Sequence, residues 1–419
     1  MSQALGERPF TDWHPPVMAL LWRGLIRATG DVSAMAAMQV AGLWLALWLL
    51  AFAVWKRSGS RGLSLAMLAV GLTPQAITFT GVVWKDVHMA YALLIVLGVA
   101  LVAGGWTPGW VKSRWAALIV GVVLLAYAVL VRKNAVLAVV PMFILLIGSL
   151  WPHPGRRRWL AASGTLLVTL GVATMAVSRM AEPIRTRQYA QIPLDDLVHV
   201  LDPQEIRVAA EKAGASADFR DRLVATTEKC QKDDIPWDAF FNCYPRPPDF
   251  GRPWRFSAAQ KDALVSMWVE QMPRHSVRYV EYRIRTFATL LFQGNLRYLT
   301  PETDDSTLRP ANPDLGFAVK EYVTGLERDT APIFQGWFWL GVSSVLALRR
   351  RWPGPWSREL KLLGASSVLY ILGYMPTAPS ANYRYLYWPA LAGTTALVLV
   401  AVSYVLQRRT KPGRPTSSE

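Results

Sequence analysis

Residues 115–150 read WAALIVGVVLLAYAVLVRKNAVLAVVPMFILLIGSL. Two apolar runs in this stretch flank a turn made of Arg132, Lys133 and Asn134. The runs cover 115–131 and 135–152. A helix needs about 20 mostly apolar residues to cross a hydrocarbon core of about 30 Å, and both runs approach that length. The stretch therefore predicts two membrane-spanning helices joined by a short basic turn.

Apolar runs of this kind recur along the chain. They cover 34–55, 62–84, 87–111, 115–131, 135–152, 159–178, 331–348, 362–383 and 385–407. Of the 419 residues, 52% are hydrophobic and 19 are tryptophan, a composition that favours a membrane protein over a soluble one. The sequence predicts an all-α fold, a polytopic transmembrane helical bundle with about nine spans.

The formal net charge of +16 is unevenly distributed. The polar segment 179–330 holds 21 Lys or Arg and 23 Asp or Glu, so this segment is nearly neutral. The rest of the chain holds 24 basic and 6 acidic residues, and most of these basic residues lie in alternate short loops. Short loops rich in Lys and Arg stay on the cytoplasmic side of a membrane. The charge therefore indicates topology and not a nucleic-acid partner.

This topology predicts four parts of the chain. They are 1–178, an N-terminal membrane bundle with an interfacial helix at 15–28; 179–330, a mostly helical periplasmic insert; 331–407, the C-terminal membrane helices; and 408–419, a disordered cytoplasmic tail. In the insert, a helical pattern breaks near Gly214, Ser257 is expected to cap a helix, and Pro273 is expected to begin the next one.

The chain has 2 cysteines, Cys230 and Cys243, and both fall in the segment expected to lie outside. An oxidising compartment allows such a pair to form a disulfide. The pattern favours that disulfide, and two free thiols in a soluble lobe remain the alternative.

The N-terminal stretch FTDWHPPVMALLWRGL, residues 10–25, places Asp12 and His14 just before a short amphipathic helix. Pro15 and Pro16 suit a helix start. The helix is too short to span a membrane, so we expect it to lie in the outer interface. Asp12 and His14 are then held at the outer membrane boundary.

Other ionisable groups are expected on the same outer side. They are Lys85 and Asp86 in WKD, Arg132 and Lys133 beside Asn134 in VRKNA, and Arg384 beside Tyr385 in SANYRYLYWP. Basic residues there oppose the positive-inside bias, and a lipid-linked phosphate at the membrane surface would explain them. A carboxylate facing the same ligand can act as general base on an acceptor hydroxyl.

Simpler interpretations stay open. Asp12 could merely cap the following helix, and His14 could be a packing residue. Lys85 and Asp86 could form a solvated turn, and the basic pair after residue 131 could reach lipid headgroups. The aromatic residues around Arg384 could form an interfacial belt.

FTDWHPPVMALLW resembles the D-x-H-P-P-L stretch of the first outer loop in GT-C glycosyltransferases, which include protein O-mannosyltransferases and lipid A aminoarabinose transferases. The resemblance implies that Asp12 is the catalytic base, that Asp86 in WKDV lies in the second acidic outer loop, and that Arg384 in NYRYLYWP meets the donor phosphate. RKN is similar to a basic turn of bacterial members. The family has a spanning helix before the aspartate loop, so we expect one upstream of Met1.

This resemblance implies an inverting membrane glycosyltransferase at the periplasmic face of the bacterial inner membrane. Its donor would be a polyprenyl-phosphate-linked sugar, and its acceptor a lipid, glycan or protein. Asp86 would be the second catalytic residue, which orients the acceptor or the sugar or holds a divalent metal. One alternative is an O-antigen ligase or polymerase, for which Arg274, His275 and Arg278 in the insert would be central. A transporter is a further alternative, although the expected spans carry almost no charge.

Overall fold

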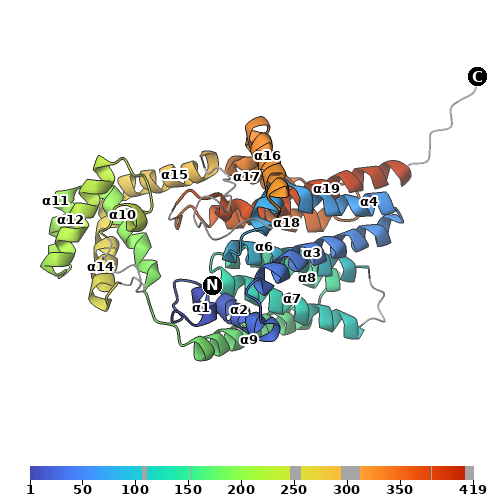
Figure 1. Ribbon diagram of the computed structural model, residues 1–419. Coiled ribbons are helices and arrows are strands. Elements are labelled where there is room, and N and C mark those ends of the chain that lie inside the picture. The colour runs from blue at the N-terminus through green and yellow to red at the C-terminus, as the bar shows by residue number, and fades with distance from the viewer. Residues whose placement is uncertain (106–110, 152, 246–255, 294–311, 379, 411–419) are drawn as a thin grey trace, which may run out of the picture. The chain divides into compact units, whose positions relative to one another are not determined.

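The computed structural model describes residues 1–105, 111–151, 153–245, 256–293, 312–378 and 380–410 (Figure 1). These residues are almost entirely helices and their connections, and the one β feature among them is a parallel bridge between Thr11 and Ile184. The expected all-α class is confirmed. The expected tail falls mostly on 411–419, outside the described residues.

The chain forms two compact units. The lobe consists of 1–19, 178–294 and 373–382, and the bundle consists of 20–177, 295–372 and 383–419. Both units are therefore assembled from segments that are far apart in the sequence.

The helices of the bundle arise from the expected apolar runs, apart from the helices at 16–29 and 313–329, which lie outside these runs. In chain order these are α2 (Pro16–Thr29), α3 (Ala34–Ser58), α4 (Arg61–Leu65), the 3-10 helix η1 (Ala66–Leu72), α5 (Pro74–Thr80), α6 (Lys85–Ala103), α7 (Val111–Val131), α8 (Ala135–Leu150), α9 (Arg156–Ala181), α16 (Pro313–Asp329), η4 (Ala331–Phe334), α17 (Gly336–Leu348), α18 (Ser357–Leu372), η5 (Tyr383–Leu386) and α19 (Tyr387–Thr410). α2 coincides with the expected interfacial helix, and its position in a membrane stays a prediction.

Five of the described helices are long and apolar enough to cross a membrane, namely α3, α6, α7, α9 and the η5–α19 segment. A sixth candidate is the pair formed by α4 and η1 with α5, which bends by 58°. α8 and α17 are apolar but have only 16 and 13 residues, which is short of the roughly 20 that a span needs. The expected number of about nine spans is therefore not established.

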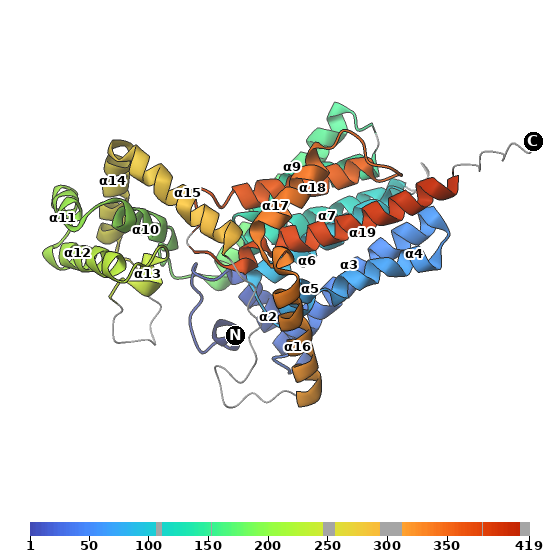
Figure 2. The ribbon, with the colours of Figure 1, turned by 90° about the horizontal axis from the view of Figure 1, so that it is seen from above.

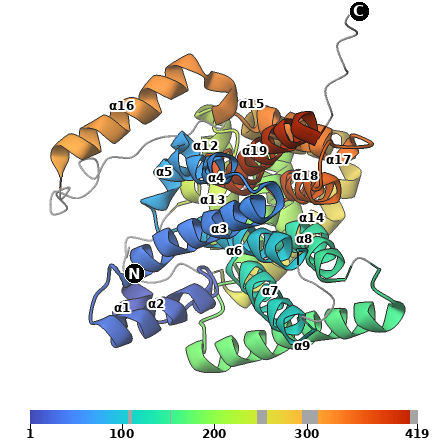
Figure 3. The ribbon, with the colours of Figure 1, turned by 90° about the vertical axis from the view of Figure 1, so that its right-hand side faces the viewer.

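α6 lies at the centre of the bundle. Most of its residues are buried, and it packs against α3, α7 and α8. The approach to α3 is close, because a Cβ at Gly98 would lie 2.7 Å from the Cβ of Leu49. In contrast, almost none of α9 is buried, and Figure 3 shows α9 at the periphery.

The expected insert 179–330 does not form one unit. α16 packs against α5, and the Tyr322 hydroxyl donates to the carbonyl of Leu72 at 2.9 Å. α16 therefore belongs to the bundle, where Figure 2 shows it lying across the direction of α3 and α19. The expected boundary at 330 differs from the division into compact units because α16 contacts the bundle. The side of a membrane on which 179–330 lies stays a prediction.

The lobe is a small helical unit with its own core. Its helices are α1 (Ser2–Leu5), the 3-10 helix η2 (Gln188–Ala190), α10 (Gln191–Val200), α11 (Pro203–Lys212), α12 (Ala217–Lys232), α13 (Ala239–Asn242), α14 (Ala258–Arg274) and α15 (Ser276–Phe292). Leu194, Leu197, Phe219 and Leu264 are fully or almost fully buried in this core, and Trp13 packs against it. The N-terminal stretch is thereby attached to the lobe.

Local signals in the lobe act largely as expected. Ser257 Oγ accepts a hydrogen bond from Gln260 N, and Gln260 Oε1 accepts one from Ser257 N; this capping box starts α14. Gly214 has a φ of +67°, which suits glycine and separates α11 from α12. Pro273 does not begin a helix as expected. It lies in the last turn of α14, which ends at Arg274.

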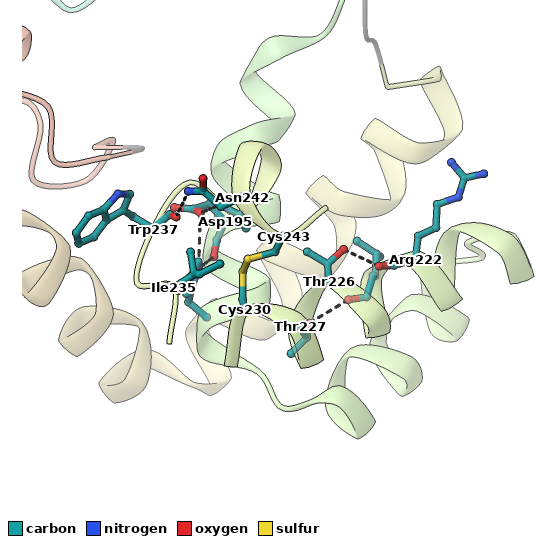
Figure 4. The surroundings of a disulfide bond; sticks show 12 residues. Asp195, Arg222, Thr226, Thr227, Cys230, Ile235, Trp237, Asn242 and Cys243 are labelled. Carbon is teal, nitrogen blue, oxygen red and sulfur yellow. Dashed lines mark hydrogen bonds and ion pairs between the residues drawn. A yellow bond between two sulfur atoms is a disulfide. The ribbon is translucent and has the colours of Figure 1, made fainter. Parts of the chain in front are cut away.

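Cys230 and Cys243 are joined by a disulfide (Figure 4). The bond connects the end of α12 to the residue after α13, with 5.4 Å between the Cα atoms. The neighbouring chain is also fixed, since Ile235 N donates to the carbonyl of Cys230 at 2.9 Å and Asn242 Nδ2 to that of Trp237 at 3.1 Å.

Candidate functional site

The candidate site of the bundle begins at the N-terminus of α6. Lys85 and Asp86 form the first turn of this helix, and Asp86 is 0% exposed. The interpretation of these two residues as a solvated turn pair is therefore wrong. The preceding segment is held by Gln39 on α3, whose side-chain amide donates to the carbonyls of Thr80 at 2.9 Å and Val82 at 3.1 Å.

Asp86 faces Arg132, which follows the last residue of α7. Arg132 Nε lies 3.1 Å from Asp86 Oδ1, and the two side chains are 12% and 1% exposed. Neither oxygen of Asp86 accepts a hydrogen bond from another described residue. The interpretation of Arg132 as a headgroup-reaching side chain is wrong, because its charge is directed at a buried carboxylate.

Arg384 completes the group from the other end of the sequence. Its guanidinium carbon lies 5.4 Å from the ring centroid of Trp84 and 5.2 Å from that of Tyr385. Tyr385 also stacks on Arg132, at 4.9 Å from the ring centroid to the guanidinium carbon. Tyr385 thus contacts both arginines, and its hydroxyl also accepts a hydrogen bond from Arg384 Nη2 at 3.3 Å. Cation–π contacts of this kind orient a guanidinium.

Two lysines add to the positive charge. Lys85 lies within electrostatic range of Asp86, Arg132, Arg384 and Lys133. Lys133 is exposed, so its ammonium group is accessible to a ligand. We call the group of Lys85, Asp86, Arg132, Lys133, Arg384 and Tyr385 the basic cluster. It places four basic side chains around one buried carboxylate.

Three helix N-termini converge on the basic cluster. α6 begins at Lys85, α8 begins one residue after Asn134, and α19 begins two residues after Tyr385. Asn134 precedes α8 without making a side-chain cap. The N-terminus of a helix carries partial positive charge and unsatisfied N–H groups, which favour anions. The helix N-termini and the basic side chains therefore both favour the binding of an anion.

The aromatic residues around Arg384 do not form an interfacial belt. Tyr383, Tyr387 and Trp388 are almost completely buried inside the bundle. The Tyr387 hydroxyl donates to that of Tyr91 on α6 at 3.0 Å, and Trp388 Nε1 donates to Ser366 Oγ at 3.1 Å. These bonds tie the start of α19 to α6 and α18, and so they help to fix Arg384.

Asp12 lies in the lobe, where its partner is Thr186. Asp12 Oδ1 accepts a hydrogen bond from Thr186 N at 2.7 Å and a second, short one from the Thr186 hydroxyl. The two residues are 174 positions apart, and no local signal in the sequence pairs them. The interpretation of Asp12 as only a helix cap is not supported, since these bonds lead away from α2.

The structure thus groups the expected site residues into two sets. Asp12 and the exposed His14 belong to the lobe, and the basic cluster belongs to the bundle. The approach of Asp12 to the basic cluster stays a prediction.

The lobe contains a buried polar network that the sequence did not indicate. Arg283 on α15 pairs with Asp196 on α10 at 2.6 Å and donates to the carbonyl of Ala378 at 3.1 Å. Trp268 Nε1 donates to Asp196 at 2.7 Å. Burial raises the pKa of Asp196 to about 6, because lost hydration outweighs the attraction of Arg283. This network joins α10, α14, α15 and residues 373–382.

Arg274, His275 and Arg278, which would be central in an O-antigen ligase, lie at the end of α14 and the start of α15. Arg274 and Arg278 are exposed and pair with Glu270 and Glu205 at 2.6 and 2.8 Å. His275 contacts Arg278 through Nδ1. These pairs occupy the lobe surface rather than a buried site.

A divalent metal does not fit the residues around Asp86. No group of three or more His, Cys, Asp or Glu side chains in the described part of the chain could hold a metal ion. Asp86 is moreover surrounded by Arg132, Lys85 and further basic side chains, which would repel a second positive group.

No protein-family model matches the sequence, and no curated protein matches it. Among solved structures, the chain is similar to the crystal structure of ArnT from Cupriavidus metallidurans bound to undecaprenyl phosphate. The similarity covers 92% of this chain and 68% of that one, at 14% identity and a TM-score of 0.33. A likeness at this level carries no argument about the reaction, so the function is inferred from the residues of this chain.

Proposed function

We propose that the protein is a membrane glycosyltransferase that moves a sugar from a polyprenyl-phosphate donor to a lipid, glycan or protein acceptor. The reaction would take place at the periplasmic face of the bacterial inner membrane, with the C-terminus in the cytoplasm. The observation that carries the proposal is the basic cluster, in which Arg132, Arg384 and two lysines gather at the N-termini of apolar helices. Such a site suits an anionic head on an apolar chain.

In the proposed reaction the acceptor hydroxyl attacks the anomeric carbon of the sugar in a single displacement. Asp12 takes the hydroxyl proton while the new carbon–oxygen bond forms. The bond between the anomeric carbon and the phosphate oxygen breaks, and its electron pair leaves with the polyprenyl phosphate. One displacement inverts the configuration at the sugar.

The basic cluster would act on the leaving group. Negative charge develops on the phosphate oxygen as the bond breaks, and Arg384 with Lys85 and Lys133 would stabilise that charge. Arginine suits the phosphate because its planar fork can donate two hydrogen bonds at once. Asp86 would keep Arg132 oriented through their ion pair and would not bind a metal.

The test uses the purified full-length protein in nanodiscs, supplied with polyprenyl phosphates that carry radiolabelled hexoses, pentoses or aminopentoses and with a bacterial envelope extract as acceptor. We expect transfer of label by the wild type and only a trace of it by Asp12→Asn, with insertion and thermal midpoint unchanged. Arg274→Ala is the matched variant for the ligase alternative. Normal transfer by Asp12→Asn together with a dead Arg274→Ala would favour that alternative instead.

A further inference from the structure

The N-terminal stretch and the segment after α9 run side by side in the lobe. Ile184 N donates to the carbonyl of Phe10 at 2.9 Å, and Asp12 N donates to the carbonyl of Ile184 at 3.2 Å. These two bonds form the parallel bridge and fix the register of the two segments. Thr186 is therefore placed opposite the side chain of Asp12 by backbone pairing alone.

Thr186 directs both of its donors at one oxygen of that side chain. Its backbone N–H and its hydroxyl both reach Asp12 Oδ1, and Thr186 is 0% exposed. No described residue donates a hydrogen bond to Oδ2. Two hydrogen bonds to Oδ1 restrict rotation of the carboxylate about the Cβ–Cγ bond of Asp12. The direction of Oδ2 is therefore also fixed.

The backbone around Thr186 is itself held in place. Arg187 has a φ of +57°, a left-handed conformation that non-glycine residues adopt only when the surrounding structure enforces it. Its side chain donates to the carbonyl of Phe256 at 3.0 Å, and Phe256 belongs to the buried core of the lobe. In the N-terminal stretch, Trp13 packs against Phe240 in a tilted arrangement, with 5.3 Å between the ring centroids.

We infer that Thr186 is a positioning residue, which orients the Asp12 carboxylate so that Oδ2 faces the acceptor hydroxyl. The inference rests on the proposed function, in which Asp12 is the base. The backbone pairing and the packing of Trp13 already attach the N-terminal stretch, so the hydroxyl of Thr186 is not needed for attachment. Its specific effect is on the orientation of the carboxylate.

The experiment compares three variants of the full-length protein in the transfer assay. Thr186→Val keeps the volume and the backbone N–H but removes the hydroxyl. We expect its kcat to fall about tenfold or more, as for loss of one hydrogen bond to a charged group, with KM for the donor unchanged. Thr186→Ser restores the hydroxyl and should restore kcat. Thr11→Val makes the same change at a buried neighbour that contacts Gln3, and kcat should stay at the wild-type value.

The double variant Asp12→Asn/Thr186→Val separates orientation from folding. If Thr186 acts through Asp12, adding Thr186→Val to Asp12→Asn lowers the residual rate no further. Wild-type kcat in Thr186→Val, an additive loss in the double variant, or a Thr186→Ser as impaired as Thr186→Val would each overturn the inference. Normal transfer by Asp12→Asn would instead overturn the proposed function, so the two failures are distinguishable.

Discussion

Arg132 and Asp86 form a buried ion pair, with Nε 3.1 Å from Oδ1 and side-chain exposures of 12% and 1%. The pair connects the end of α7 to the first turn of α6, the central helix of the bundle. Burying two charges is costly unless each compensates the other. The pair therefore has a structural role in addition to the functional one proposed for its surroundings.

The two roles can be separated by replacing both charges. Arg132→Met alone leaves Asp86 buried without its counter-charge, and we expect the unfolding free energy to drop by about 3 kcal/mol. Asp86→Leu/Arg132→Met should recover most of the thermal midpoint in detergent and still fail to transfer sugar. Equal midpoints for the single variant and the wild type would show that the pair does not stabilise the bundle.

Replacing Arg384 should weaken binding of the donor lipid. Arg384→Ala removes charge-assisted hydrogen bonds to the phosphate, each worth about 1.5–3 kcal/mol, so the Kd for undecaprenyl phosphate should rise about ten- to hundredfold. The Kd of Arg384→Lys should lie between those of the wild type and Arg384→Ala, because an ammonium keeps the charge but cannot donate in a bidentate fashion. The Kd is measurable by thermal shift in detergent micelles.

The control for this change is Arg349→Gln. Arg349 follows α17 and stacks on Trp352 at 4.6 Å, away from the basic cluster in the sequence. We expect its Kd to equal that of the wild type. If both variants weaken binding equally, the lipid is attracted by overall charge and not by the basic cluster.

The stability of the lobe should depend on the protonation of Asp196. Its pKa is raised from 3.8 to about 6, chiefly by burial, so the folded lobe keeps this proton to a higher pH than the unfolded chain. Stability from this group is full below about pH 4 and is lost as the pH rises through about 6, by about 3 kcal/mol in all.

Asp196→Asn does not titrate and provides the comparison. Its thermal midpoint should rise relative to that of the wild type between pH 4.5 and pH 7.5, and differential scanning fluorimetry at both values measures this difference. A difference that is the same at the two pH values would contradict the raised pKa.

Opening the disulfide should loosen the lobe. Cys230 and Cys243 are 13 positions apart, and closing a loop of that length stabilises by about 3 kcal/mol in the chain-entropy account. Treatment with a reductant should therefore make the lobe more sensitive to limited proteolysis. Cys230→Ser/Cys243→Ser should show this sensitivity without reductant and no further change with it, because the chain has 2 cysteines in all. Unchanged proteolysis of the reduced wild type would argue that the surrounding packing suffices.

Local sequence predicted the helices well and their membrane role less well. Apolar runs such as 115–131 coincide with single helices, and Ser257 caps α14 as expected, because both depend on neighbouring residues. The number of membrane-spanning helices, in contrast, is not determined by neighbouring residues alone. The run 62–84 is broken into α4, η1 and α5 with a bend of 58°, and such a bend depends on packing against other helices.

Burial was the property most often misjudged. Tyr383, Tyr387 and Trp388 suited an interfacial belt as well as a bundle interior, because an aromatic ring with one polar group fits both places when that group finds a partner. A solvated turn was the simpler alternative for Asp86, and its ion pair with Arg132 accounts for a carboxylate that is 0% exposed.

The sequence by itself determined the all-α membrane class, because long apolar runs favour membrane helices. It also determined the disulfide partners, because a chain with 2 cysteines can form one internal pair. It also singled out the residues of the basic cluster, because basic turns on the side expected to be outside are unusual. Only the tertiary structure decided which groups face each other: Arg132 with Asp86, and Thr186 with Asp12 from 174 positions away. Contacts at such separations arise when distant segments pack together, and no local pattern of residues records them.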